Sequence, residues 1–208
     1  MPELIAYASR TGTKRNLALL REAGWRLLVS AAGVLRNEGF PYALDNGAWS
    51  AFSQGKPFDE SMFGLALRRL GRDADWTVIP DIVAGGAQSL QLSLRWMQRV
   101  LDECGRGLLA VQDGIEPQHV QHLIGARVGI FVGGSTAWKL STIKQWSDLA
   151  KHHGAWCHVG RVNTARRIYQ CSAAGATSFD GTSATRYAAT LPHLDGAKRQ
   201  LNLGLESS

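Results

Sequence analysis

The chain has 208 residues, with 23 Lys and Arg against 17 Asp and Glu, and its formal net charge is +6. No linker-like segment, repeat or low-complexity tract divides it, so we expect one domain over residues 1–208. No stretch offers the roughly 20 apolar residues of a membrane-spanning helix, and the start has no secretory signal pattern, so we expect no membrane association.

Eight short apolar runs, often β-branched, are typical of buried parallel strands. Helical patterns lie between most of them, and glycines follow several of these patterns, as is usual at a helix C-terminus. The expected strands are Leu4–Ala8, Leu27–Ser30, Tyr42–Asp45, Thr77–Asp81, Leu108–Gln112, Val128–Val132, Trp156–Val159 and Ala176–Asp180. The expected helices are Lys14–Ala23, Ser61–Leu70, Ser89–Cys104, Pro117–Ile124, Ser141–His152 and Asn163–Ala174.

Strands that alternate with helices predict an α/β fold, a compact (β/α)8 TIM-like barrel in a single domain. The length agrees with this prediction, since such barrels begin at about 200 residues. The second unit is the weak one, because Ala31–Pro41 is a poor helix. An open doubly wound sheet is the alternative that the same alternation allows.

Three of the expected strands deliver an aspartate where the strand should stop. These residues are Asp45, Asp81 and Asp180. If the strands are neighbours in one sheet or barrel, the three carboxylates converge at one end, where such folds build their active sites. A nucleophile, a general acid/base and a polar recognition group can be made from them. Each aspartate could instead cap the helix that follows it.

The cysteines and histidines predict neither disulfides nor a metal site. Cys104, Cys157 and Cys171 are widely spaced and odd in number, which favours reduced thiols in a cytosolic setting. No CxxC motif or Cys/His cluster exists, and pairs such as His119 and His122 are typical of a solvated helix face. We therefore expect no metal and no other cofactor.

The positive charge favours a polyanionic partner and salt-sensitive binding. Arg161 and Arg186 flank the last two expected strands, near Asp180 in the sequence, and are candidates to contact nucleic acid. Trp49, shortly after Asp45, could stack on a base, although most tryptophans serve packing.

Several of these strand ends, in order, resemble motifs of the tRNA-guanine transglycosylase superfamily. The resemblance is to its small DNA-modifying branch, the phage-type DNA-guanine transglycosylases that insert 7-deazaguanine bases into DNA. It covers roughly residues 42 to 187, and its strength lies in the order of the motifs, because none is specific alone. The segments are Leu44-Asp45-Asn46-Gly47-Ala48-Trp49, Pro80-Asp81-Ile82-Val83, Val111-Gln112-Asp113-Gly114, Phe131-Val132-Gly133-Gly134-Ser135, His158-Val159-Gly160, Phe179-Asp180 and Thr185-Arg186.

The resemblance implies roles for the matching residues. Asp180 would be the nucleophile and Asp45 the general acid/base. The base would be read by Asp81, Gln112 and the backbone N–H groups of Gly133 and Gly134. The partners would be DNA and a 7-deazaguanine base such as a 7-cyano derivative, with an accessory protein as a further candidate, in the cytoplasm of a bacterium or a phage-infected host cell.

The departures from the family pattern also carry information. Asn46 and Ala48 replace Ser and Gly in the first motif, and Gly181 replaces the residue after the nucleophile. The family's C-terminal zinc site, Cys-x-Cys-x-x-Cys followed by His, is absent, and the chain is far shorter than the tRNA enzymes. Both points make tRNA a weaker candidate substrate than DNA.

Base exchange needs these residue types for reasons independent of the family. Breaking the C1′–N bond passes through an oxocarbenium-like state that a carboxylate such as Asp180 can capture as a covalent sugar–enzyme intermediate. A second group, Asp45, must protonate the leaving base and deprotonate the incoming one. Asp81 can accept from the N1–H and 2-amino groups of guanine, and the target base must leave the stack to reach the pocket.

Other interpretations stay open on the sequence alone. Asp113 could be the acid/base in place of Asp45, and His158 is expected to be a packed histidine, with a role in the pocket as the lesser alternative. A small-molecule enzyme could use Gly133-Gly134-Ser135 to cradle a phosphate. A third possibility is a non-catalytic subunit that binds nucleic acid for a partner enzyme.

Overall fold

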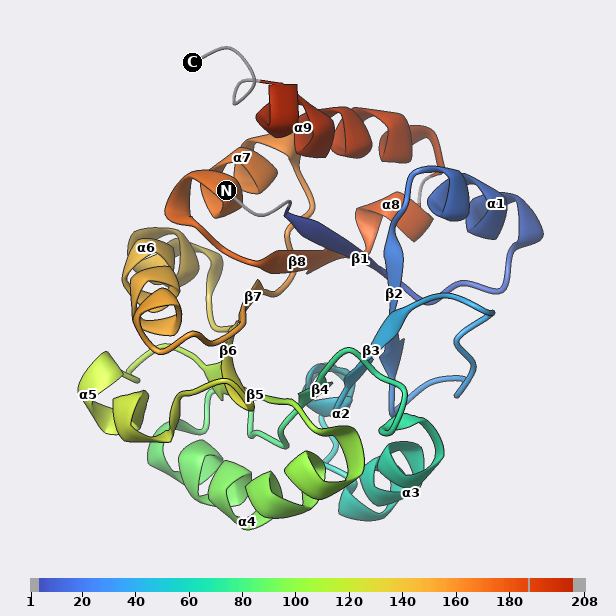
Figure 1. Ribbon diagram of the computed structural model, residues 1–208. Coiled ribbons are helices and arrows are strands. Elements are labelled where there is room, and N and C mark those ends of the chain that lie inside the picture. The colour runs from blue at the N-terminus through green and yellow to red at the C-terminus, as the bar shows by residue number, and fades with distance from the viewer. Residues whose placement is uncertain (1–3, 187, 204–208) are drawn as a thin grey trace.

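The computed structural model describes residues 4–186 and 188–203, and in it eight parallel strands form a closed barrel surrounded by helices (Figure 1). The predicted (β/α)8 barrel is confirmed, and the open sheet is ruled out. The strands are β1 (Ile5–Ser9), β2 (Arg26–Ser30), β3 (Tyr42–Asp45), β4 (Thr77–Val78), β5 (Gly107–Val111), β6 (Val128–Val132), β7 (Cys157–Val159) and β8 (Ser178–Gly181). The α-helices are α1 (Lys14–Glu22), α2 (Ala48–Ser53), α3 (Glu60–Leu70), α4 (Gly86–Cys104), α5 (Pro117–Val120), α6 (Thr136–His152), α7 (Ala165–Ala174), α8 (Ser183–Arg186) and α9 (Leu191–Leu203), with 3-10 turns η1 (Gln121–Leu123) and η2 (Ala188–Thr190).

Closure of the barrel depends on the pairing of β1 with both β2 and β8. Tyr7 lies opposite Arg26 on one side and opposite Asp180 on the other. Because all the strands run in the same direction, their carboxyl ends share one rim. Asp45 at the end of β3 and Asp180 near the end of β8 therefore belong to the same end of the barrel.

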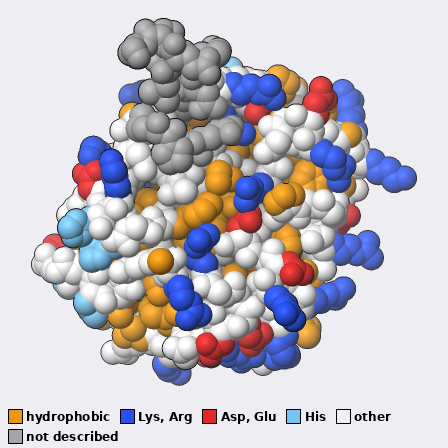
Figure 2. All heavy atoms as spheres, in the orientation of Figure 1, with side chains coloured by type: hydrophobic (Ala, Val, Ile, Leu, Met, Phe, Trp, Pro, Cys, Tyr) orange, Lys and Arg blue, Asp and Glu red, His pale blue; other side chains and the backbone are white. Residues whose placement is uncertain are grey.

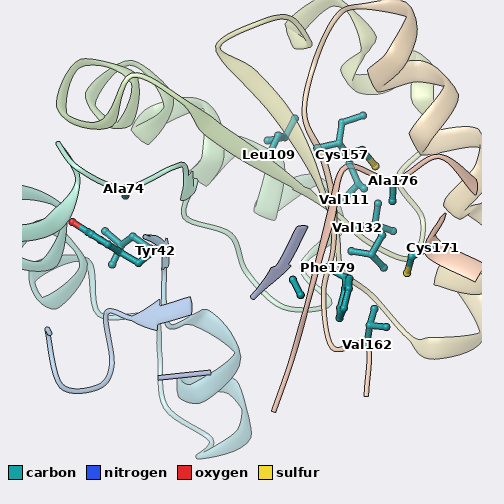
Figure 3. Close-up of a cluster of buried hydrophobic side chains, with 14 of the residues drawn as sticks. Tyr42, Ala74, Leu109, Val111, Val132, Cys157, Val162, Cys171, Ala176 and Phe179 are labelled. Carbon is teal, nitrogen blue, oxygen red and sulfur yellow. The ribbon is translucent and has the colours of Figure 1, made fainter. Parts of the chain in front are cut away.

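Apolar side chains form two layers, one outside and one inside the ring of strands. The outer layer packs strand residues such as Leu109, Val132 and Phe179 against the helices, and Figure 3 draws part of it. The inner layer fills the barrel with five fully or almost fully buried side chains, Tyr7, Ala43, Trp76, Val78 and Leu108. The alternation of inward and outward positions along each strand separates the two layers.

A polar cluster closes the amino-terminal end of the barrel. The Tyr7 hydroxyl donates to Asp75 at 2.9 Å and accepts from the Trp76 indole at 3.1 Å. Arg26 pairs with Asp75 at 2.8 Å. Burial raises the pKa of Tyr7 well above its usual range, so the phenol stays neutral and can donate to the carboxylate.

Most expected elements are present with small changes at their ends, and β3 and β6 have the expected bounds. The strand expected over Thr77–Asp81 is shorter, since β4 ends at Val78. Pro80 has no N–H for the ladder, and its carbonyl accepts from the Ser93 hydroxyl at 2.8 Å instead. Residues 31–41 form no helix, in agreement with the weak second unit.

Two helices that matter for the barrel, α2 and α9, were not predicted from the sequence. Helix α9 packs beside α7 (Figure 1), and its Leu191, Leu194 and Ala197 are buried. Asp195 of α9 accepts from the Trp25 indole at 3.0 Å, which ties the helix to the start of β2. No helix in the described part of the chain is long and apolar enough to cross a membrane.

Gly129 of β6 faces the barrel interior and gives a test of the packing there. An added Cβ would lie 2.5 Å from both Leu108 Cδ2 and the Trp156 carbonyl oxygen. Because a backbone oxygen cannot move away easily, we expect Gly129→Ala to lower the free energy of unfolding by about 3 kcal/mol. Urea denaturation measures this. Gly125→Ala is the control, since a Cβ there meets nothing within 4 Å, and equal stability of both variants would contradict the described packing.

Candidate active site

Asp180, Asp45 and Asp81 gather at the carboxyl-terminal rim of the barrel. Asp45 is the last residue of β3, Asp180 lies one residue before the end of β8, and Asp81 follows β4 in the loop before α4. Burial is the largest cause that raises the pKa of Asp45 to about 6, and the negative charges of Asp180 and then Asp81 contribute to this rise. The three carboxylates are therefore close enough to act on one another.

Asp180 is held by donors from β7 and the loop after it. The side chain is almost fully buried. Its Oδ1 is 3.0 Å from His158 Nε2 and accepts from the Arg161 backbone N–H at 3.2 Å. Within residues 4–186 and 188–203, both side-chain hydrogen bonds of Asp180 use Oδ1. This arrangement leaves Oδ2 for a reacting atom.

Arg161 adopts a left-handed backbone conformation with φ of 59°. This conformation is costly for a residue with a side chain and often marks a functional site. Here it directs the Arg161 N–H toward Asp180. The guanidinium donates to the Gly134 carbonyl and lies 4.1 Å from the centroid of the Trp49 ring. Arg161 thus links helix α2 with the loops after β6 and β7 next to Asp180.

Asp45 has the environment of a proton-transfer group. It is half-buried, accepts from the Gly47 N–H at 3.1 Å and is hydrogen-bonded by Ser30. These hydrogen bonds favour the ionised form, but burial outweighs them and brings the pKa to about 6. A carboxyl group with a pKa near neutrality can both donate and accept a proton.

Asn46 holds Asp81 in place, and the sequence analysis treated this residue only as a departure from the family motif. Its Nδ2 donates to Asp81 Oδ1 at 2.7 Å and to the Ile79 carbonyl at 3.1 Å. Its own Oδ1 accepts from the Ala48 N–H at 2.8 Å. Burial raises the pKa of Asp81 to about 6 despite the bond from Asn46. An amide suits this position because it donates to two acceptors and accepts once.

Gln112 supports the loop after β4, which was not expected. The buried side chain accepts from the Ala84 N–H at 2.7 Å and donates to the Ile82 carbonyl at 2.8 Å. Its amide therefore faces the loop that carries Asp81. In this structure, both ends of the Gln112 amide hold the loop after β4, whereas the sequence predicted contact with a base oxygen.

The turn after β6 also differs from the expectation. The Gly133 N–H donates to the Val111 carbonyl at 2.8 Å and is not directed toward the rim in this structure, which favours the Gly134 N–H as the candidate donor to a base. Asp113 accepts from both the N–H and the hydroxyl of Ser135 at 2.7 Å. These bonds lower the pKa of Asp113. An exposed and readily ionised carboxylate of this kind is poorly suited to acid/base chemistry, which argues against Asp113 as the alternative to Asp45.

A pocket of about 330 Å³ adjoins Asp81. This volume is within the range of small-molecule sites. Phe52 on its wall is strongly exposed for a phenylalanine, and the cationic residues Lys56 and Arg95 also line the pocket. Among the lining residues, only Asp81 was given a functional role from the sequence. The lining residues are Ala48, Ala51, Phe52, Lys56, Pro57, Phe58, Glu60, Asp81, Ile82, Val83, Leu92 and Arg95.

A buried lysine lies behind the Asp180 loop and was also missed. Lys139 of α6 donates to the Gly160 carbonyl. Burial and then the positive charge of Arg161 lower the pKa of Lys139 to about 8, while the charge of Asp180 acts in the opposite direction. Lys139 therefore supports the turn between β7 and Arg161. Arg186, the other predicted nucleic-acid contact, is exposed at the end of α8.

Among residues 4–186 and 188–203, no group of three or more His, Cys, Asp and Glu side chains could hold a metal ion. Comparison of the chain with protein-family models gives no match, and comparison with curated proteins gives no significant match. The chemistry open to the site therefore has to be inferred from its own residues.

Asp45→Asn tests whether this carboxylate carries a burial penalty. The folded pKa of about 6 lies above the usual 3.8, so the penalty is absent below pH 3.8, grows as the pH rises toward 6 and is complete above it. We expect the variant to be more stable than the parent by about 1–3 kcal/mol at pH 8 and by much less at pH 4.5. Urea denaturation at both pH values measures the difference. Asp102→Asn, which removes an exposed carboxylate of α4, is the control; a gain for Asp45→Asn that is equal at both pH values would contradict the burial of its charge.

Proposed function

We propose that the protein is a DNA-guanine transglycosylase, a glycosyltransferase that exchanges guanine in DNA for a 7-deazaguanine base. One observation carries the proposal. A buried carboxylate, Asp180, has one oxygen held by two N–H groups, while the nearby Asp45 has a pKa near neutrality. A fixed nucleophile beside an acid/base group is the pair that a retaining glycosyl transfer requires.

In the first step, Asp180 Oδ2 forms a bond to C1′ of the deoxyribose as the bond from C1′ to guanine N9 breaks. The bonding electrons leave with guanine, and the Asp45 carboxyl donates the proton that neutralises it. In the second step, Asp45 accepts the N9 proton of the incoming base. That nitrogen attacks C1′ and displaces Asp180, which regains its charge. The exchange is balanced without metal, reductant or oxidant.

Asp81 is the recognition group in this proposal. An ionised Asp81 accepts from the N1–H and 2-amino groups of guanine, which the leaving and incoming bases share. Asn46 keeps the carboxylate in a fixed orientation, and the adjoining pocket of about 330 Å³ offers room beside it. The Gly134 N–H is the candidate donor to the base O6.

DNA approaches the site with one nucleotide turned out of the stack. Trp49, a residue that is 46% exposed, offers a surface for a neighbouring base, and Arg161 and Arg186 supply positive charge at the same rim. The net charge of +6 favours a polyanion. On the face in Figure 2, Lys and Arg side chains are scattered and do not gather in one patch. Binding of DNA is therefore expected to depend on contacts close to the site.

The phosphate-binding alternative is not supported by the turn after β6. A phosphate would need backbone N–H groups and the Ser135 hydroxyl. The Gly133 N–H is used by Val111, and Asp113 takes both donors of Ser135 and adds a negative charge. The turn is thus closed to an anion.

Asp180→Asn tests the nucleophile. The substitution keeps the size of the side chain but removes the charge that attacks C1′, so we expect base exchange to fall by at least about 10³-fold while the fold is unchanged. Mass spectrometry of DNA nucleosides, after incubation with a 7-deazaguanine base, measures exchange, and circular dichroism checks the fold. Near-parental exchange by the variant would exclude Asp180 as nucleophile. A parent chain that binds DNA and never exchanges bases would favour the non-catalytic subunit.

Asp81→Asn separates recognition from chemistry. The side-chain amide would turn a donor toward the donors of guanine, at a cost on the order of 1–3 kcal/mol for the unpaired groups. We expect about 10–100-fold weaker binding of the free base, with a covalent protein–DNA adduct that still forms slowly. Denaturing gels detect the adduct, and Asp180→Asn is the control that should form none. Parental base affinity in Asp81→Asn would show that another group reads the base.

A further inference from the structure

His158 of β7 lies inside the barrel directly beneath Asp180. The side chain is completely buried, and its Nε2 is 3.0 Å from Asp180 Oδ1. The Phe131 ring stacks on it with centroids 5.0 Å apart, and Trp76 lies at 4.5 Å and Tyr7 at 5.7 Å. These rings hold the imidazole in one orientation. The sequence analysis expected a packed histidine, and the structure adds the contact with Asp180.

A chain of hydrogen bonds determines which ring nitrogen carries the proton. The Trp156 indole, which can only donate, is 2.7 Å from Ser178 Oγ. Ser178 Oγ is 2.8 Å from His158 Nδ1. A neutral His158 must donate through Nε2, because an ionised Asp180 only accepts. The lone pair of Nδ1 then accepts the single hydroxyl proton of Ser178, and every group in the chain is satisfied.

The charges around the ring favour this neutral form. Burial lowers the pKa of His158 most strongly, and the charge of Lys139 from α6 lowers it as well. Asp180 from β8 acts in the opposite direction. The Tyr7 hydroxyl from β1 is directed to Asp75 at the far end of the barrel. In an imidazolium, Nδ1–H would donate to Ser178 Oγ instead, and the hydroxyl proton of Ser178 would lose His158 Nδ1 as its acceptor.

We infer that His158 is a positioning residue for Asp180, held as the Nε2–H tautomer by Ser178 and Trp156. This inference rests on the proposed function for its chemical consequence. The His158 N–H fixes Oδ1, so that Oδ2 points to C1′ in the first step. In the second step, the same N–H stabilises the negative charge that returns to Asp180 when its bond to C1′ breaks. No proton moves to or from His158.

The tautomer can be measured without any substrate. Long-range ¹H–¹⁵N NMR of the free protein between pH 6 and 8 should show His158 as a neutral ring that is protonated at Nε2. In Ser178→Ala, which removes the hydroxyl that Nδ1 accepts from, the Nδ1–H or charged form should gain population. Ser147→Ala is the matched control. Ser147 of α6 carries a buried hydroxyl that contacts Cys157, the residue before His158 on β7. A charged or Nδ1–H ring in the parent protein would overturn the inference.

The consequence for the reaction needs two substitutions. His158→Phe keeps an aromatic ring and removes the donor, and we expect kcat to fall on the order of 100-fold with little change in KM. His158→Gln returns an N–H donor near the position of Nε2 and should recover at least about tenfold of that loss. Equal activity of the parent and His158→Phe, or a loss in KM alone, would overturn the inference. Thermal unfolding shows whether the compared variants are folded. If a His158 variant is not folded, Ser178→Ala takes its place in the comparison, and we again expect kcat to fall.

The two proposals fail in different ways. An Nε2–H tautomer in a parent protein that never exchanges bases overturns the proposed function and, with it, the role of His158 in the reaction. Base exchange by the parent together with parental kcat in both His158→Phe and Ser178→Ala overturns the role of His158 alone.

Discussion

The candidate site depends on closure of the barrel by β8. This strand pairs with β1 on one side and β7 on the other, which sets Asp180 opposite Tyr7 and brings it within a hydrogen bond of His158. A parallel barrel leaves its strand ends at one rim but fills its interior with side chains. Asp180 lies between the filled interior and the rim. Its Oδ1 is held by hydrogen bonds, and its Oδ2 is left for the proposed reaction.

This arrangement costs stability, because it places several negative charges together in a buried part of the molecule. Burial and mutual repulsion raise the pKa of Asp45, and burial raises that of Asp81. The stabilising forces lie elsewhere, in the apolar layer between strands and helices and in the Tyr7–Asp75–Arg26 cluster at the opposite end. A stable amino-terminal end and a strained carboxyl-terminal rim are typical of this fold. The left-handed backbone of Arg161 belongs to the strained rim.

The barrel and its three rim aspartates could be predicted because both depend on local patterns. Short apolar runs that end in Asp45 and Asp180 report strand ends directly. The partners of polar side chains depend on how distant loops meet, and the sequence contains no local signal for them. Gln112 was expected to face a base and instead holds the loop after β4, and Asp113 is occupied by Ser135. Helix α9 could have been predicted, because Leu191 and Leu194 are three residues apart, a spacing that places them on one face of a helix.

The His158 imidazole beneath Asp180 suits a nucleophile because it is uncharged. An imidazolium paired with Asp180 would offset its charge and weaken the proposed attack on C1′, whereas a neutral N–H orients the carboxylate and leaves the charge in place. Lys139 illustrates the distinction, because its cation is directed to the Gly160 carbonyl and not to the carboxylate. Its field also opposes protonation of His158. The same lysine therefore supports the turn that presents the Arg161 N–H and helps to keep the imidazole an uncharged donor.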